Sequence, residues 1–154
     1  LIPLIVGFIW YNPKLFGTVW MKEAGLTPES LAGANMLKIF GFSYILSVLA
    51  AFIMQFMVIH QFGVYSVLAD QPGINDATSE MGLYYADFMS KYGNTFHTFK
   101  HGVFHGVLAG IFFALPVLGI NSLFDRKSFK YIAINAGFWI VTLALMGGII
   151  CQFS

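Results

Sequence analysis

The sequence predicts an all-helical membrane protein, a bundle of four transmembrane helices. Hydrophobic residues make up 58% of the 154-residue chain and charged residues only 10%, whereas soluble domains carry roughly 25% charged residues. The stretches 39–59, 102–124 and 131–154 contain no Asp, Glu, Lys or Arg. Each is long enough to cross a bilayer core, which takes about 20 helical residues.

The spans are expected at approximately 1–11, 36–60, 98–124 and 129–152, all within one integral membrane domain covering residues 1–154. The first stretch is too short to cross, so we interpret it as the visible part of a truncated helix that stops at Pro13. A tight loop at 125–128 makes the last two spans an antiparallel hairpin. We expect a kink in the third span before Pro116.

One further helix is predicted between the first two spans, and the helix of the second span is predicted to begin before it enters the membrane. Residues 14–23 are typical of a short interfacial helix on the cytoplasmic side, ended by Gly25. The next helix has Thr27 as its N-cap and Pro28 at its first helical position. We expect it to run unbroken from there to about residue 61.

The long connection at 61–100 is also expected to contain a helix. Aromatic and methionine residues recur there at helical spacing between Asp76, a suitable N-cap, and Gly93, a suitable C-cap. This pattern predicts an amphipathic helix lying on the outer membrane surface. Asn94 or Thr95 would then cap the third span.

The distribution of basic residues predicts the orientation. Two connections hold six of the eight basic residues, namely Lys14, Lys22 and Lys38 in the first and Arg126, Lys127 and Lys130 in the second. Basic residues in short loops stay on the cytoplasmic side, so both termini and the 61–100 loop of this multi-pass membrane protein are expected to face outward. The net charge of +1 without a basic patch excludes a nucleic-acid partner.

All four histidines fall near the predicted outer face. His60 ends the second span, whereas His97, His101 and His105 enter the third at i, i+4, i+8 spacing and so form one stripe. Two histidines four residues apart can chelate one metal ion. All three cannot, because His97 and His105 are about 12 Å apart along the helix axis.

Further ligands would have to come from elsewhere in the chain. His60, with Asp87 or Glu80 from the outer helix, would give a mixed imidazole and carboxylate site suited to zinc, copper, iron or nickel. A haem held by His60 and either of the two deeper histidines of the stripe is the other geometry that two adjacent helices offer.

Two alternatives to a metal or haem remain open at this point. Lys100 and the positive end of the helix dipole oppose a bound cation and favour an anion, such as a lipid phosphate, on Lys100, His97 and the backbone donors of residues 94–97. Otherwise the histidines are interfacial residues, hydrogen-bonded to backbone, water or lipid headgroups.

A small-xxx-small pattern accompanies the histidines. Gly102, Gly106 and Gly110 permit close helix contact, and packing inside the monomer, against Gly147 and Gly148, is favoured over a dimer interface.

Two asparagines and one cysteine complete the set of polar residues singled out in the last two spans. Asn121 and Asn135 are expected to hydrogen-bond across the hairpin, and Cys151, the single cysteine, is interpreted as a buried small residue. We find no phosphate-binding glycine loop, nucleophile elbow or His-Glu-x-x-His motif, so catalysis by a recognised constellation is unsupported.

Several short motifs resemble one known family. They are Val6–Pro13, 15–17 and Trp20-Met21 near the start, His101–Gly106 in the third span, and 128–130, Ile134–Gly137 and Leu145–Gly148 near the end. Together they are similar to the small bacterial membrane proteins known as domain of unknown function 1761, with 101–106 in a form typical of Bacteroidetes members. The resemblance implies a four-span fold in a bacterial inner membrane and no reaction. The outer insertion is longer than the usual family pattern.

Two function hypotheses follow. The first is a non-enzymatic accessory protein in the lipid bilayer, either a homo-oligomer or a subunit of a larger membrane complex. The second is a carrier, sensor or redox protein with a transition metal, haem or anion at the outward histidine cluster.

Overall fold

The computed structural model describes residues 1–154 and consists of helices and their connections, without a strand. Three helices are long and apolar enough to cross a membrane: α4 (Met36–Val58), the continuous helix Phe99–Phe124, and α9 (Phe129–Gln152). The fourth expected span corresponds to α1 (Ile2–Trp10), which packs on α9 but has only nine residues. The helical membrane fold is therefore confirmed, with three full-length spans.

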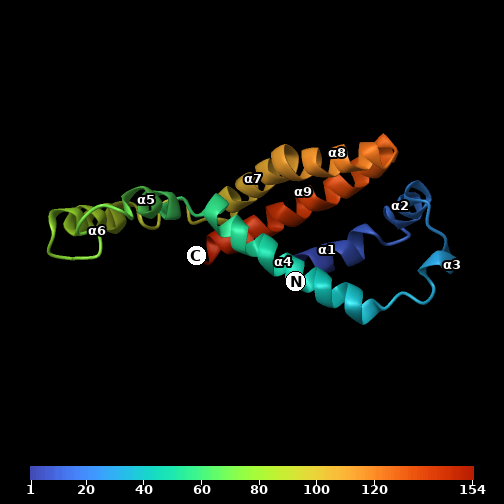
Figure 1. The fold of residues 1–154 in the computed structure, drawn as a ribbon, viewed down its shortest axis with the longest axis horizontal. Coiled ribbons are helices and arrows are strands. Elements are labelled where there is room, and N and C mark those ends of the chain that lie inside the picture. Colours follow the sequence, from blue (N-terminus) through green and yellow to red (C-terminus); the bar gives the residue numbers. More distant parts are fainter.

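The helix α9 forms the centre of the bundle. Half of the most apolar stretch of α9 is buried inside the bundle, compared with 6% of the corresponding stretch of α4. Figure 1 shows α7 and α8 along one side of α9, with α1 and α4 on the other side. The core cluster that joins α4 to α9 includes Met54, Val58 and Cys151.

The backbones of α7 (Phe99–Ala109) and α9 lie in direct contact. A Cβ atom added to Gly102 would lie 2.1 Å from the carbonyl oxygen of Gly147, and one added to Gly106 would lie 2.2 Å from that of Leu143. Gly110 lies in the same way against Ile140. These three glycines, the glycine stripe of the third span, therefore pack against α9 of the same chain.

The third span contains one turn of π-helix, η1 (Gly110–Ala114), between α7 and α8 (Leu115–Phe124). It lies immediately before Pro116, where a kink was expected. Proline has no N–H and its ring collides with the carbonyl group four residues earlier, and a wider turn accommodates that ring within a continuous helix. The helix begins after Thr98, whose side chain accepts a hydrogen bond from a backbone N–H, so Asn94 and Thr95 are not its caps.

The long helix expected from Pro28 to about residue 61 is interrupted. Thr27 caps a single turn, α3 (Pro28–Leu31), as predicted, but the chain then turns through Gly33, which has a φ of +86°. The span α4 has its own N-cap, Asn35, whose side chain accepts a hydrogen bond from the backbone N–H of Lys38. The left-handed glycine and the second cap explain the break.

The short helix between the first two spans is α2 (Gly17–Ala24), and Gly25 ends it in the left-handed conformation, as predicted. Lys127 Nζ donates a hydrogen bond of 2.8 Å to the carbonyl oxygen of Ala24, and Ser128 donates to the carboxylate of Glu23. The two connections rich in basic residues therefore lie at the same end of the bundle.

The hydrogen bond expected between Asn121 and Asn135 does not form. The side chain of Asn135 donates to the carbonyl oxygen of Tyr131 and accepts from the hydroxyl of Tyr11, at 2.9 Å. Asn121 is exposed and makes no side-chain hydrogen bond. The stop after α1 brings Tyr11 to α9, and this contact uses the polar atoms of Asn135.

The 61–98 segment carries α5 (Gln61–Leu68) and the amphipathic α6 (Glu80–Tyr92). Gly93 is the C-cap as expected, but the N-cap is Ser79, because Asp76 uses its carboxylate in a local turn with Thr78. Figure 1 shows both helices extending from the bundle along its long axis. The amphipathic helix expected in this connection is present, and its position on the outer membrane surface stays a prediction.

The glycine contact predicts that replacing glycine by alanine has different effects at two positions. Gly106→Ala should lower the free energy of unfolding by about 1–3 kcal/mol, because its Cβ would overlap the α9 backbone. Gly41→Ala, in an open part of α4, should leave it unchanged or raise it by up to about 1 kcal/mol. Unfolding in detergent micelles measures both, and equal destabilisation would contradict the packing described.

The orientation predicts a labelling pattern in a Cys151→Ala background. Asp76→Cys should react with a membrane-impermeant maleimide in intact cells, whereas Arg126→Cys should react only after the membrane is permeabilised, because basic loops stay in the cytoplasm. The reverse pattern would overturn the orientation.

Candidate metal centre

Three of the four histidines meet at the end of the bundle from which α5 and α6 extend. One ring nitrogen from each of His60, His101 and His105 can act as a ligand, and these three atoms all lie within 4.8 Å of one another. The Nε2 atoms of His60 and His101 are 2.9 Å apart. Each ring centroid is 4.5–4.9 Å from the other two.

Two chain segments bring these rings together. His101 and His105 are one turn apart on α7, whose adjoining glycine face is fixed against α9. His60 lies where α4 has ended at Val58 and α5 has not yet begun. The change of direction at this junction places a residue distant in sequence beside the α7 pair.

Phe96 covers part of the cluster. Its ring stacks on that of His101, with centroids 4.8 Å apart and an interplanar angle of 18°, and it meets His60 edge-on. Phe96 has a φ of +68°, a conformation that is strained for a bulky side chain. The sequence contains no pattern that indicates this role, because it depends on the loop before α7.

The cluster suits one transition-metal ion. Three neutral imidazoles and one open position are a ligand set of catalytic zinc sites, and imidazole also suits copper, iron and nickel. With metal–nitrogen bonds of about 2.0–2.1 Å, tetrahedral geometry separates the nitrogens by roughly 3.3 Å. The observed spacing of the three nitrogens brackets this value.

Residues 1–151 match the family model described as "Protein of unknown function (DUF1761)". The chain belongs to the DUF1761 family. No curated protein and no solved structure matches it. The match includes all three clustered histidines of this DUF1761 protein.

His97 lies apart from the cluster in the DUF1761 protein. Its Nε2 atom is 3.1 Å from the side-chain oxygen of Gln61, and its Nδ1 atom is 3.2 Å from the carbonyl oxygen of Ser154. The amide nitrogen of Gln61 donates to the carbonyl oxygens of Tyr92 and Thr95. His97 therefore helps join the base of α5 to the ends of α6 and α9.

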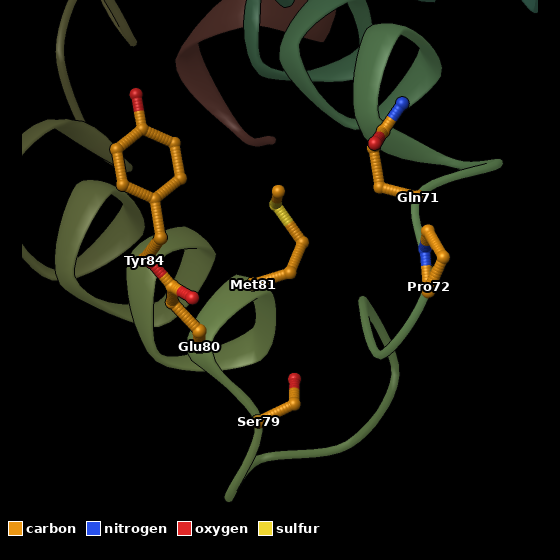
Figure 2. A pocket seen from close by; sticks show the side chains of 6 residues that line it. All are labelled: Gln71, Pro72, Ser79, Glu80, Met81 and Tyr84. Atoms are coloured by element: carbon orange, nitrogen blue, oxygen red, sulfur yellow. The ribbon is translucent and has the colours of Figure 1, made fainter.

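The two acidic residues expected to complete the site do not reach it. Asp87 is exposed on α6 and forms an ion pair of 2.7 Å with Lys91. Glu80 is at the start of α6 and lines a separate cavity of about 490 Å³ with residues that include Gln71 and Tyr84 (Figure 2). Because α6 points away from the bundle, the mixed imidazole and carboxylate site is replaced by one of imidazoles alone.

The cluster does not fit a haem. Two axial histidines must lie on opposite faces of a flat macrocycle, but the His60 and His101 nitrogens are in hydrogen-bond contact and the His105 ring shares the same space. Three rings that converge on one point suit a single ion.

Part of the expected anion site is already engaged within the chain. Of the backbone N–H groups of residues 94–97, those of Thr95 and His97 bond to the carbonyl oxygens of Tyr92 and Asn94. His97 is engaged as described, and Lys100 is exposed without an ion pair.

Proposed function

We propose that this DUF1761 protein is a membrane metal-binding protein whose His60–His101–His105 centre holds one transition-metal ion in a carrier, sensor or redox role. The observation that carries the proposal is the convergence of three ring nitrogens within 4.8 Å. Polar groups at membrane depth are costly and are usually placed there for function. Neither helix capping nor helix packing requires three adjacent imidazole rings from two separate chain segments.

The depth of the site supports exchange with the aqueous phase. His101 is the third residue of α7 and His105 the seventh, so they lie about 3–9 Å along the helix from its first residue. His60 is exposed. We place the centre at the outward boundary of the inner membrane, in agreement with the basic residues at the opposite end of the bundle.

The composition of the site favours binding over hydrolysis. The metal-ligating group contains only histidines, and no carboxylate is present to act as the general base that hydrolytic zinc sites use. A three-coordinate imidazole centre still leaves room for a further ligand.

The proposal predicts that the purified protein, free of a histidine tag, binds one equivalent of Zn²⁺ in detergent. His101→Ala and His105→Ala should each weaken the binding by about 100-fold or more, because removing a ligand costs at least as much as removing a group that supports one. His97→Ala is the matched control and should leave the affinity unchanged. Calorimetric titration measures all four proteins.

Lowering the pH tests the same metal centre in a second way, through the release of bound zinc. Metal ligation requires neutral imidazole, and histidine ordinarily gains its proton near pH 6.5. Bound zinc should therefore be released as the pH falls below about 6. Binding that survives both histidine substitutions would show that the ion lies elsewhere.

A second candidate function, a self-associating subunit of a membrane complex, is favoured by the uncovered surface of α4. Only Ser47, Met54 and Val58 of its 23 residues are buried, so a broad apolar face is left for lipid or for a second copy of the chain. The glycine stripe no longer supports this function, because α9 occupies it.

Cross-linking distinguishes a second copy from lipid on this face. In a Cys151→Ala background, Leu46→Cys on α4 should form disulfide-linked dimers in native membranes. Phe112→Cys, near the middle of the third span, should not, although Phe112 is even more exposed than Leu46. Monomers in both cases would assign the α4 face to lipid.

A further inference from the structure

A cavity of about 320 Å³ lies directly beside the histidine cluster. Two residues of the cluster region, His60 and Phe96, form part of its wall, and Val64 on α5 with Phe88 and Tyr92 on α6 form much of the rest. Its volume is near the lower end of the range for small-molecule sites. The base of the α5–α6 pair therefore forms an open pocket next to the histidine cluster.

The wall of this cavity is suited to an uncharged ring. The rings of Phe88 and Tyr92 are adjacent, with centroids 5.1 Å apart, and Phe96 presents a third aromatic side chain. Gln61 also lines the cavity, but both ends of its amide are already engaged with Tyr92, Thr95 and His97. A charged ligand would lose hydration without compensation, whereas an aromatic one gains stacking and burial.

His60 belongs to both the cavity wall and the cluster. A ligand in the cavity therefore lies against a metal-ligating residue, and three histidines leave the fourth coordination position free. We propose that the cavity binds a small neutral aromatic compound whose single nitrogen or oxygen donor completes the coordination of the metal. This inference rests on the proposed metal-binding function and names the class of ligand that the centre recognises.

The test uses Co²⁺ as a spectroscopic probe in the full chain, near pH 8, where imidazoles are neutral. The visible absorption of the cobalt protein is followed during titration with imidazole and, separately, with 4-phenylimidazole. Both compounds offer the same donor atom, but only the second carries a ring to fill the cavity. Burial of that ring should make 4-phenylimidazole bind roughly ten- to a hundredfold more tightly.

Two valine substitutions on α5 test whether the preference for 4-phenylimidazole depends on the cavity. Val64→Trp fills the cavity and should remove the preference for 4-phenylimidazole while the cobalt spectrum before titration is retained. Val67→Trp is the matched control, because Val67 is 77% exposed and does not line the cavity. It should preserve the preference.

The outcomes separate the two proposals. Cobalt bands with equal affinity for both compounds, or a preference that survives Val64→Trp, would overturn the inference and leave the metal centre intact. A protein that develops no cobalt bands would overturn both the metal centre and the inference that rests on it.

Discussion

The direct contact between the backbones of α7 and α9 determines where the other functional elements lie. Membrane helices gain little from burying apolar side chains away from equally apolar lipid, so close packing of small residues is a main source of their association. Gly102 and Gly106 allow that approach because a Cβ on either would overlap the opposite backbone. The contact fixes the rotation of α7 about its axis and therefore the direction in which its histidines point.

The histidine centre depends on that rotation and on the break in helical structure between α4 and α5. With the glycine face of α7 against α9, His101 and His105 are available to the end of α4. The helix α4 ends at Val58, before His60, and the junction with α5 turns this residue toward the pair. A site assembled in this way joins two spans, so metal binding would stabilise the bundle as well as serve a function.

The sequence predicts the parts of this arrangement that depend on local patterns. Apolar runs without charge locate the spans, and the i, i+4, i+8 spacing places His97, His101 and His105 on one stripe from which two neighbouring histidines could chelate an ion together with His60. The structure selects His101 and His105 from that stripe. The caps at Thr27, Gly25 and Gly93 are likewise local and are confirmed.

The remaining features depend on tertiary geometry, which residue patterns do not encode. Asp87 was expected at the metal because an amphipathic helix was expected to lie flat on the membrane, whereas the turns before α6 direct that helix away from the bundle. The hydrogen bonds of Asn135 and His97 are made with partners distant in sequence. The stacking of Phe96 on His101 requires a left-handed backbone at a residue type that rarely adopts it.

Metal binding by the three clustered histidines in the cell is tested most directly by elemental analysis. The protein is purified from its native membrane without a histidine tag or chelator, beside the His101→Ala/His105→Ala double variant. We expect a near-stoichiometric transition metal in the natural protein and its loss from the variant, with both folded. A natural protein without such a metal, or a variant that retains it, would contradict metal binding at these histidines.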